Sequence, residues 1–346
     1  MNSHMMAAVL YGKEHLQVEP VAVPTIESGD ILVRVKVALT CGTDVKVFRR
    51  GYHARMIVPP AVFGHELAGD VVAVGEDVTR FAVGDRVVAA NSAPCDKCYF
   101  CRRSLQNLCE DLLFNNGAYA EYIRIPARIV EKNTYPIPAH VDYRDAALIE
   151  PLACVVRGFE ESNPREGDTI AIMGLGPIGL MFVKLAKLYN CRVIAVGRRP
   201  QQLERAAAMG ADDLVLCHDE SDPVAIVRNL THRRGVDIAI EAVGKPQTWE
   251  WAVNMVRRGG TVNFFGGCPN DSKVNLDTAL LHYSEITCKA SFHHTPAYIR
   301  KALDLITAGH ISASFFVNRE EPLKNLLAVM RHLMSHNGHL KTAIVP

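Results

Sequence analysis

The first 150 residues carry short apolar segments that fit strands better than helices. In residues 31–37, apolar side chains alternate with Arg34 and Lys36, which predicts a strand with one buried face. Two further apolar runs, at residues 67–74 and 86–90, are separated by glycine-containing turns. Short strands at this spacing predict a compact β-barrel.

Beyond about residue 150 the spacing of the apolar positions changes. Apolar runs alternate with stretches of helical spacing, and Pro200 and Gly210 stand where a helix would begin and end. This alternation predicts an α/β unit with a doubly wound parallel sheet and helices on both faces. Its strands are expected at residues 169–173, 192–196, 214–216, 236–241, 261–265 and 286–291. An amphipathic helix follows from about Tyr298 and a strand at 342–345, so the α/β unit is expected to be inserted in the first domain.

Composition narrows the class of protein further. The chain has 346 residues, 49% hydrophobic and 22% charged, as in ordinary globular proteins of about two domains. Its 38 basic and 37 acidic residues give a net charge of +1, which excludes nucleic acid and anionic membranes as bulk partners. It has no apolar run of about eighteen residues, so no spanning helix is expected. The start lacks the features of a secretion signal, so we expect a cytoplasmic protein with reduced thiols.

A glycine-rich turn follows the strand predicted at residues 169–173. Its sequence is Gly174-Leu175-Gly176-Pro177-Ile178-Gly179, which fits the G-x-G-x-x-G pattern at the start of a helix. There the glycines allow a tight turn, a close approach to a pyrophosphate, and close packing of helix on strand. The turn therefore predicts a dinucleotide site, although a glycine-rich turn can also be purely structural.

The end of the second predicted strand bears on the choice of cofactor. An NAD site carries an acid there for the ribose hydroxyls, whereas this chain has Gly197 followed by Arg198 and Arg199. Two guanidinium groups can pair with the 2′-phosphate of NADP, so NADP is favoured. The alternative is that both arginines are solvated on a loop.

Four of the ten cysteines lie within fifteen residues: Cys95, Cys98, Cys101 and Cys109. Four thiolates at this spacing are typical of a closed, structural zinc site that does no chemistry. An iron–sulfur cluster and redox disulfides are the alternatives.

A second set of metal-ligand types is dispersed along the chain, at Cys41, His65 and Glu150. One thiolate, one imidazole and one carboxylate with an open position are the ligands of a catalytic zinc. Each residue also has a simpler explanation, as a small core thiol, a core histidine, or an acid at a helix start. The residue types alone leave both possibilities open.

These motifs resemble the zinc-dependent medium-chain dehydrogenase/reductase superfamily, within the alcohol dehydrogenases, over essentially the whole chain. The resemblance rests on Cys41-Gly42-Thr43-Asp44, Gly64-His65-Glu66, Gly84-Asp85-Arg86-Val87, the four-cysteine segment, Gly117-Ala118-Tyr119-Ala120-Glu121-Tyr122, Glu150-Pro151-Leu152 and the glycine-rich turn. Glu150-Pro151-Leu152 is similar to the polyol (sorbitol) and threonine dehydrogenase branch.

The resemblance implies a Rossmann domain inserted in a GroES-like β-barrel catalytic domain. The domains are expected at residues 6–152, with a structural zinc lobe at 91–112, at 153–295 for the Rossmann domain, and at 296–346 for the return to the catalytic domain. The resemblance also implies a homo-oligomer, either a tetramer or a dimer, in which the last two strands of the inserted sheet could form the shared edge.

The resemblance also implies roles for the dispersed residues. Cys41, His65 and Glu66 hold the catalytic zinc, and Glu150 either binds it directly or holds its water. The resemblance therefore implies catalytic roles for both Glu66 and Glu150.

Two further residues bear on proton transfer and the cofactor. Thr43 is implied to pass the substrate proton toward the nicotinamide ribose, and Gly266 to lie at the cofactor. The family often has histidine where this chain has Lys46, and an ordinary lysine is a poor proton shuttle at neutral pH. The role of Lys46 is therefore left open.

The implied enzyme has two zinc ions per chain and transfers a hydride between NADP, favoured over NAD, and a secondary alcohol or ketone. Its small-molecule substrate would be a polyol, sugar or amino alcohol, and nothing in the sequence identifies which one. The alternatives are an NAD-dependent threonine-type dehydrogenase, a zinc-free double-bond reductase and a non-catalytic nucleotide-binding scaffold. The zinc-free reductases lack the four-cysteine segment, and an intact ligand set argues against a scaffold.

Overall fold

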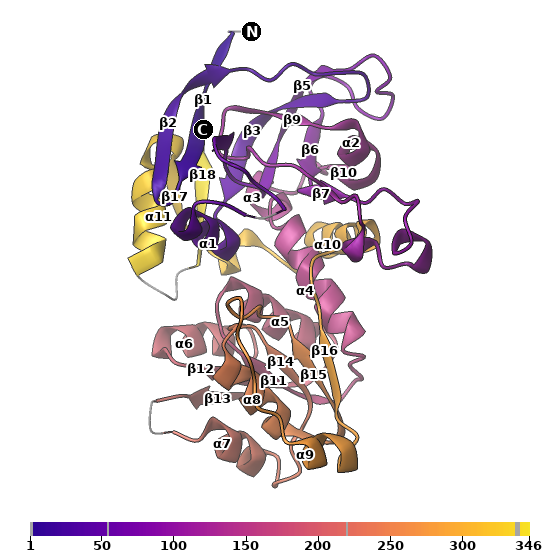
Figure 1. Cartoon of the computed structure of the whole chain (residues 1–346), viewed down its shortest axis with the longest axis vertical. Helices are drawn as coiled ribbons and strands as arrows, with labels where there is room; N and C mark the ends of the chain where they lie inside the picture. The colour runs from indigo at the N-terminus through magenta and orange to yellow at the C-terminus, as the bar shows by residue number, and fades with distance from the viewer. Residues whose placement is uncertain (1–2, 54, 219–220, 336–339) are drawn as a thin grey trace. The chain divides into compact units, whose positions relative to one another are not determined.

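The computed structural model describes residues 3–53, 55–218, 221–335 and 340–346. The chain divides into two compact units, one made of residues 1–153 and 294–346 and the other of residues 154–293 (Figure 1). Helix α4 (Ile149–Glu161) begins in the first unit and ends in the second.

The first unit is built on a seven-stranded, mainly antiparallel sheet. Its order is β10-β6-β5-β3-β18-β17, with β9 paired to β3. The strands are β3 (Ile31–Leu39), β5 (Leu67–Val74), β6 (Arg86–Ala89), β9 (Tyr122–Ile125), β10 (Thr134–Pro136), β17 (Val317–Pro322) and β18 (Lys341–Val345). The strands predicted at residues 31–37, 67–74, 86–90 and 342–345 are therefore confirmed.

Smaller sheets and helices complete this unit. A three-stranded sheet has the order β2-β1-β4, and β7 pairs with β8. These strands are β1 (His4–Gly12), β2 (His15–Ala22), β4 (Ala61–Val62), β7 (Ser92–Ala93) and β8 (Leu113–Phe114). The helices are α1 (Gly42–Arg50), α2 (Ala127–Asn133), α3 (Tyr143–Ala146), α10 (Pro296–Thr307) and α11 (Leu326–Ser335).

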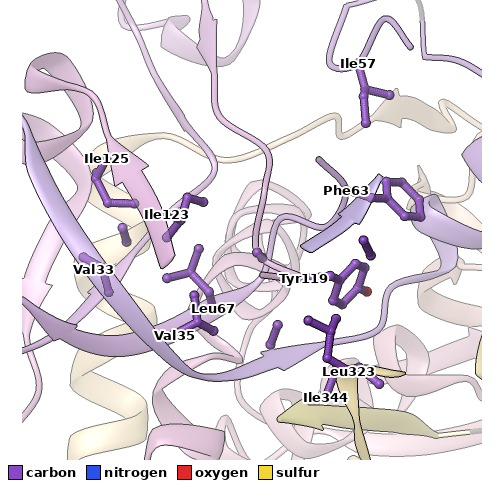
Figure 2. Close-up of a cluster of buried hydrophobic side chains, with 14 of the residues drawn as sticks. Val33, Val35, Ile57, Phe63, Leu67, Tyr119, Ile123, Ile125, Leu323 and Ile344 are labelled. Atoms are coloured by element: carbon purple, nitrogen blue, oxygen red, sulfur yellow. The ribbon is translucent and has the colours of Figure 1, made fainter. Parts of the chain in front are cut away.

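The alternating pattern of β3 places its apolar residues in the core of the first unit. Val33 and Val35 are buried, whereas Arg34 between them is exposed. The same core contains Phe63 and Tyr119, whose rings meet edge to face with centroids 5.7 Å apart (Figure 2). Burying the aliphatic and aromatic faces is the main driving force for this arrangement.

The second unit contains a parallel six-stranded sheet in the order β13-β12-β11-β14-β15-β16. Numbered along the unit, this is the order 3-2-1-4-5-6 of a doubly wound nucleotide-binding fold. The strands are β11 (Thr169–Met173), β12 (Arg192–Gly197), β13 (Asp213–Leu216), β14 (Val236–Glu241), β15 (Val256–Phe264) and β16 (Thr287–Ala290). The predicted α/β class and all six strands are confirmed.

One strand of this sheet is longer than predicted. β15 begins at Val256 rather than at residue 261, because the chain passes through Gly259 and Gly260 without leaving the sheet. The register against β14 shifts between Val236 and Ile238, and Gly259 has a φ of 64°. Paired glycines usually mark a turn, but here they form an irregularity inside a strand.

Proline begins each of the principal helices of the second unit, where its missing N–H costs nothing. These helices are α5 (Pro177–Leu188), α6 (Pro200–Ala208), α7 (Pro223–Leu230) and α8 (Pro246–Met255), and the shorter α9 spans Thr278–Tyr283. Gly210 follows α6 with a φ of 98°, as expected for a helix stop. Within the described ranges, no helix is long and apolar enough to cross a membrane.

Candidate active site

Cys41 is the N-cap of α1. Its Sγ accepts a hydrogen bond from the Thr43 backbone N–H at 3.5 Å, and the Cys41 N–H donates to Asp44 Oδ2 at 3.2 Å. This reciprocal pair is a capping box, which fixes both side chains against the first turn of the helix. The thiol therefore lies at the positive end of the helix dipole, a position that suits a negatively charged ligand atom.

Asp44 also positions His65, which lies in the loop before β5. His65 Nδ1 is 2.9 Å from Asp44 Oδ1, and the other carboxylate oxygen accepts a hydrogen bond from the Tyr119 hydroxyl at 2.6 Å. Burial opposes a charged imidazole, but the Asp44 carboxylate and the Cys41 sulfur together outweigh it and raise the pKa of His65 well above its usual value. A carboxylate on Nδ1 leaves Nε2 as the ligand atom, for which a metal ion and a proton compete.

Glu66 forms a buried ion pair with Lys341 on β18. Both carboxylate oxygens lie 2.7 Å from Lys341 Nζ, which also donates to the Thr40 carbonyl at 3.0 Å. Burial raises the pKa of Glu66 to about 7 although Lys341 opposes this shift. Burial lowers the pKa of Lys341, but the negative charges of Glu66, Cys41 and Glu150 together outweigh burial and raise it. Since an ionised carboxylate has about four lone-pair directions, this pairing leaves Glu66 able to face a cation as well.

Three predicted ligands of the catalytic zinc come together in the first unit. One ligand atom each from Cys41, His65 and Glu66 lies within 4.8 Å of the other two. Sulfur, nitrogen and oxygen donors are the ligand set of zinc, and catalytic zinc sites use three protein ligands and keep one position open. The donor set and its mutual proximity therefore fit a zinc ion.

Glu150 lies near this group but is not part of it within the described residues. It occupies the first turn of α4, is 7% exposed, and has its Oε1 3.8 Å from His294 Nε2. His294 Nε2 also lies 3.2 Å from Asn91 Oδ1. Glu150 adds a negative charge close enough to help raise the pKa of Glu66. Its role as a ligand stays a prediction.

The first helix also carries Thr43 and Lys46. Thr43 is half-buried in the first turn of α1, two residues from the Cys41 thiol. Lys46 is exposed on the same helix.

The four predicted zinc-binding cysteines of the lobe form one cluster, with their sulfur atoms within 4.8 Å of one another. Backbone N–H groups of Cys101 and Glu110 lower the pKa of Cys98 to about 6. Burial raises the pKa of the Cys101 thiol to about 12, so this thiol would keep its proton without a cation beside it. The four free thiols therefore fit a tetrahedral zinc ion, which deprotonates its thiol ligands.

The glycine-rich turn in the second unit has the geometry of a dinucleotide cradle. Gly174 has a φ of 90°, and a Cβ on Gly179 would lie 1.7 Å from the Gly174 carbonyl oxygen. Gly176 is the N-cap of α5, and a side chain there would point into open space. Pro177 and Ile178 then begin the helix, so the free N–H groups of its first turn follow directly after β11.

The predicted 2′-phosphate site follows β12. Gly197 is the last residue of the strand, Arg198 is exposed, and Arg199 is half-buried as the N-cap of α6. A Cβ on Gly197 would lie 2.9 Å from Leu175 Cδ1 in the glycine-rich turn. A glycine at position 197 therefore has two effects: it leaves room for the Leu175 side chain, and it places no acidic side chain at the end of the strand.

Gly266 lies just beyond the carboxyl end of β15. Its N–H donates to the Glu241 carbonyl at 2.7 Å, and a Cβ there would lie 2.4 Å from the Gly244 nitrogen. Its position at the carboxyl ends of the parallel strands is the edge where nucleotides bind in this class of sheet.

Sequence reasoning missed the residues that hold the ligands in place. Asp44 had a local signal, since an acid three residues after an N-cap is the capping-box spacing. Tyr119 lies in a motif that was noted only as a resemblance. Lys341 had no local signal, because it is 275 residues from Glu66.

Two family profiles match the chain. The one described as "Alcohol dehydrogenase GroES-like domain" matches residues 27–138, and the one described as "Zinc-binding dehydrogenase" matches residues 177–308.

Characterised relatives cover the chain at moderate identity. The chain is 32% identical to a sorbitol dehydrogenase of Bacillus subtilis, over 99% of this chain and 98% of that protein. It is 34% identical to an L-threonine 3-dehydrogenase of Bacillus licheniformis, over 76% of each.

Solved structures share the fold over the full length. An alcohol dehydrogenase from Thermus sp. ATN1 matches with a TM-score of 0.88 and 31% identity, over 99% of both chains. A putative zinc-binding dehydrogenase from Sinorhizobium meliloti, solved with bound NADP, matches with a TM-score of 0.89 and 30% identity, over 100% of both. The chain therefore belongs to the zinc-dependent medium-chain dehydrogenase/reductase superfamily of alcohol dehydrogenases, in the branch of the polyol and threonine dehydrogenases.

Proposed function

We propose that this dehydrogenase interconverts a secondary alcohol and a ketone of the polyol, sugar or amino alcohol class with NADP(H) as its preferred cofactor. The observation that carries the proposal is the buried group of Cys41, His65 and Glu66, which is held by Asp44 and Lys341. A scaffold protein has no need of a histidine fixed on one nitrogen and a carboxylate balanced by a buried lysine.

The predicted ligands of the catalytic zinc are Cys41, His65 and Glu66, with Glu150 as a direct ligand or the holder of a water. The zinc ion supplies Lewis acidity, which lowers the pKa of an alcohol. Asp44 keeps His65 in the tautomer that offers Nε2, because its carboxylate occupies the Nδ1 side at 2.9 Å. This arrangement presets the site before substrate arrives.

Lys341 has an electrostatic role in the proposed mechanism. Its ammonium group balances the Glu66 charge beside the ligands, which limits the negative charge of the metal pocket. A less negative pocket leaves the cation a stronger electrophile toward the alcohol oxygen. Thr43, at the start of α1, is proposed to accept the alcohol proton through its hydroxyl and pass it toward the nicotinamide ribose.

Two zinc ions per chain are proposed, one at the dispersed ligands and one at the four cysteines. Metal analysis by mass spectrometry separates the candidates: a zinc-free reductase would hold none and a scaffold only the structural ion. In His65→Ala we expect one zinc and a loss of turnover, while NADP still binds the glycine-rich turn. Normal rates in a His65→Ala protein with one zinc would rule out the proposed site.

The NADP preference rests on Gly197, Arg198 and Arg199, and the NADP-bound relative supports it. Each hydrogen bond to a charged group contributes roughly 1.5–3 kcal/mol, so one such bond gives about 10- to 100-fold in kcat/KM. The Arg198→Ala/Arg199→Ala variant should raise KM for NADPH about tenfold and leave KM for NADH nearly unchanged. The control variant Lys324→Ala/Arg331→Ala removes the same charge from exposed positions of the first unit and should change neither. A wild-type preference for NAD would refute the assignment.

The substrate class is tested by following NADPH or NADH at 340 nm with sugar alcohols, L-threonine and 2,3-diols. A clear preference for L-threonine with NAD would favour the threonine-type alternative, as the similarity to L-threonine 3-dehydrogenase allows.

We also propose a homo-oligomer, a dimer or tetramer. β16 is the edge strand of the six-stranded sheet, and Thr287 and Cys288 on it are exposed. Light scattering checks the assembly directly.

A further inference from the structure

A cavity of about 510 Å³ in the second unit is lined by five arginines and by no acidic residue. The arginines are Arg228, Arg233, Arg234, Arg257 and Arg258. The whole chain has a net charge of only +1, so this concentration of positive charge is local. Like charges at close range repel one another, and a bound anion would relieve that repulsion.

This arginine cavity lies at the opposite end of the sheet from the cofactor edge. It is formed at the end of α7, the beginning of β15 and the helix α9, and β14 begins beside it. The glycine-rich turn instead follows the carboxyl end of β11. Because the strands are parallel, their amino and carboxyl ends form opposite edges; in Figure 1, α7 and α9 lie at the lower end of this unit and α5 near its upper end.

Three of the five guanidinium groups donate to backbone carbonyl groups, and one of them is that of Arg234, which donates to the Gly235 carbonyl at 3.5 Å. Arg228 donates to the carbonyl oxygens of Asn254 at 2.8 Å and of Val256 at 3.4 Å. Arg257 donates to the Arg258 carbonyl at 2.8 Å and pairs with Asp237 at 2.5 Å. Carbonyl groups orient a guanidinium group without neutralising its charge, so the positive wall of the cavity is preorganised.

The carboxylate of Asp237 serves two of the arginines. Asp237 pairs with Arg257 and lies 3.7 Å from Arg234. One negative charge against five positive ones leaves an excess of four on the cavity. Within the described ranges, the exposed side chains of Arg233 and Arg258 make no hydrogen bond or ion pair. These two guanidinium groups keep all their donors available to a ligand.

The backbone beside the cavity is strained. His232 and Arg233 both have left-handed conformations, with φ of 51° and 62°. The Arg233 N–H donates to the Arg228 carbonyl at 2.6 Å, and the Arg233 carbonyl accepts from the Arg228 guanidinium at 3.4 Å. Two successive left-handed residues other than glycine are unfavourable, and such strain concentrates at binding sites. Here it turns the chain so that Arg233 joins the other arginines.

We infer that the arginine cavity binds a small anion with two or more phosphate charges. The flat guanidinium fork matches phosphate oxygens in pairs, and several forks around one cavity favour a polyvalent ligand over a single charge. A volume of about 510 Å³ lies within the range of roughly 300–1,000 Å³ for small-molecule sites. The inference is independent of the proposed function, because it uses none of the metal or cofactor residues.

The test is isothermal titration of the zinc-loaded enzyme at low ionic strength with inorganic phosphate, pyrophosphate and ATP. The protein is first saturated with its preferred nicotinamide cofactor, so that the glycine-rich turn and the arginines after β12 are occupied. We expect saturable binding that tightens from phosphate to pyrophosphate and weakens with added salt. Equal affinity for ATP and pyrophosphate would assign recognition to phosphates alone, and tighter binding of ATP would assign a nucleotide; both support the site.

The double variant Arg233→Ala/Arg258→Ala should lower the affinity for pyrophosphate at least tenfold at an unchanged melting temperature, since both side chains are exposed. Arg258→Glu should have at least as large an effect, because it reverses the charge. The control Lys324→Ala/Arg331→Ala should change the affinity less than twofold. Absence of saturable binding of all three anions, or binding that the double variant leaves intact, would overturn the inference.

Discussion

The buried pair of Glu66 and Lys341 gives the sharpest test of how the metal pocket is built. We predict that Lys341→Met strongly destabilises the protein, because it leaves the Glu66 carboxylate without its partner. The two side chains are 0% and 4% exposed, so solvent cannot replace the lost ammonium group. Methionine fills a similar volume, which separates the loss of charge from the loss of packing.

The magnitude follows from the geometry. At 2.7 Å and an effective dielectric constant of 20, the attraction between the two charges is roughly 6 kcal/mol. Desolvation of both groups offsets much of this attraction in the native pair. Removing one partner of a buried pair costs about 3–5 kcal/mol, because a buried charge is left alone. For a unit of this size, that cost lowers the melting temperature by roughly 6–20 °C.

The assay is thermal unfolding followed by circular dichroism at fixed zinc concentration. Lys36→Met is the matched control, because Lys36 pairs with Asp70 at 3.2 Å while its side chain is 41% exposed. An exposed pair contributes at most about 1 kcal/mol, so this control should melt within a few degrees of the wild type. The double variant Glu66→Gln/Lys341→Met should recover most of the lost stability, since no buried charge is left unpaired.

If Lys341→Met had the same melting temperature as the Lys36→Met control, the reasoning would be refuted, because Glu66 would then be neutral or in contact with water. Equal melting temperatures of Lys341→Met and Glu66→Gln/Lys341→Met would also refute the reasoning. Zinc content measured alongside distinguishes a direct ligand from a neighbour, since loss of the catalytic ion in Glu66→Gln points to direct binding.

Three further outcomes are expected. Cys98→Ser should leave one zinc per chain by metal analysis and lower the melting temperature, whereas two retained zinc ions would exclude the four-cysteine site. Asp44→Asn should weaken binding of the catalytic zinc about 10- to 100-fold in competition with a chelator, because His65 loses its anionic partner; unchanged affinity would mean that His65 needs no orientation. Gly179→Ala should abolish cofactor binding or folding, because its Cβ would lie 1.7 Å from a carbonyl oxygen, while Gly12→Ala, at a residue without a left-handed φ, meets no atom within 4 Å and serves as the control for adding a methyl group at a glycine.

Local sequence determined most of the secondary structure of the second unit. The strands at residues 169–173 and 236–241 were predicted to the residue, because a short, mainly apolar run between turn signals is a local pattern that acts within a few residues. The glycine-rich turn was predicted for the same reason, since its steric demands concern adjacent residues. The four cysteines are likewise separated by only two to seven residues, so their spacing alone predicted a common site.

Tertiary structure decided which of the dispersed residues meet. Cys41 and His65 were candidates by type only, and it is the folded barrel that brings their ligand atoms, with that of Glu66, within 4.8 Å. The pairing with Lys341 spans 275 residues, and no periodicity or turn signal extends so far. Resemblance to a family supplied the expectation for these ligands, which the residue types had left open.

The arginine cavity shows the same limit in the second unit. In the sequence, nothing distinguishes Arg228, Arg233 and Arg258 from other charged residues between apolar runs. They line one cavity because parallel strands bring the end of α7 beside the beginning of β15, and because two left-handed residues turn the chain between them. Spacing and turn chemistry act over a few residues, so the sequence by itself determined the elements. The convergence of charges from separate elements depends on how the sheet packs, which only the tertiary structure decided.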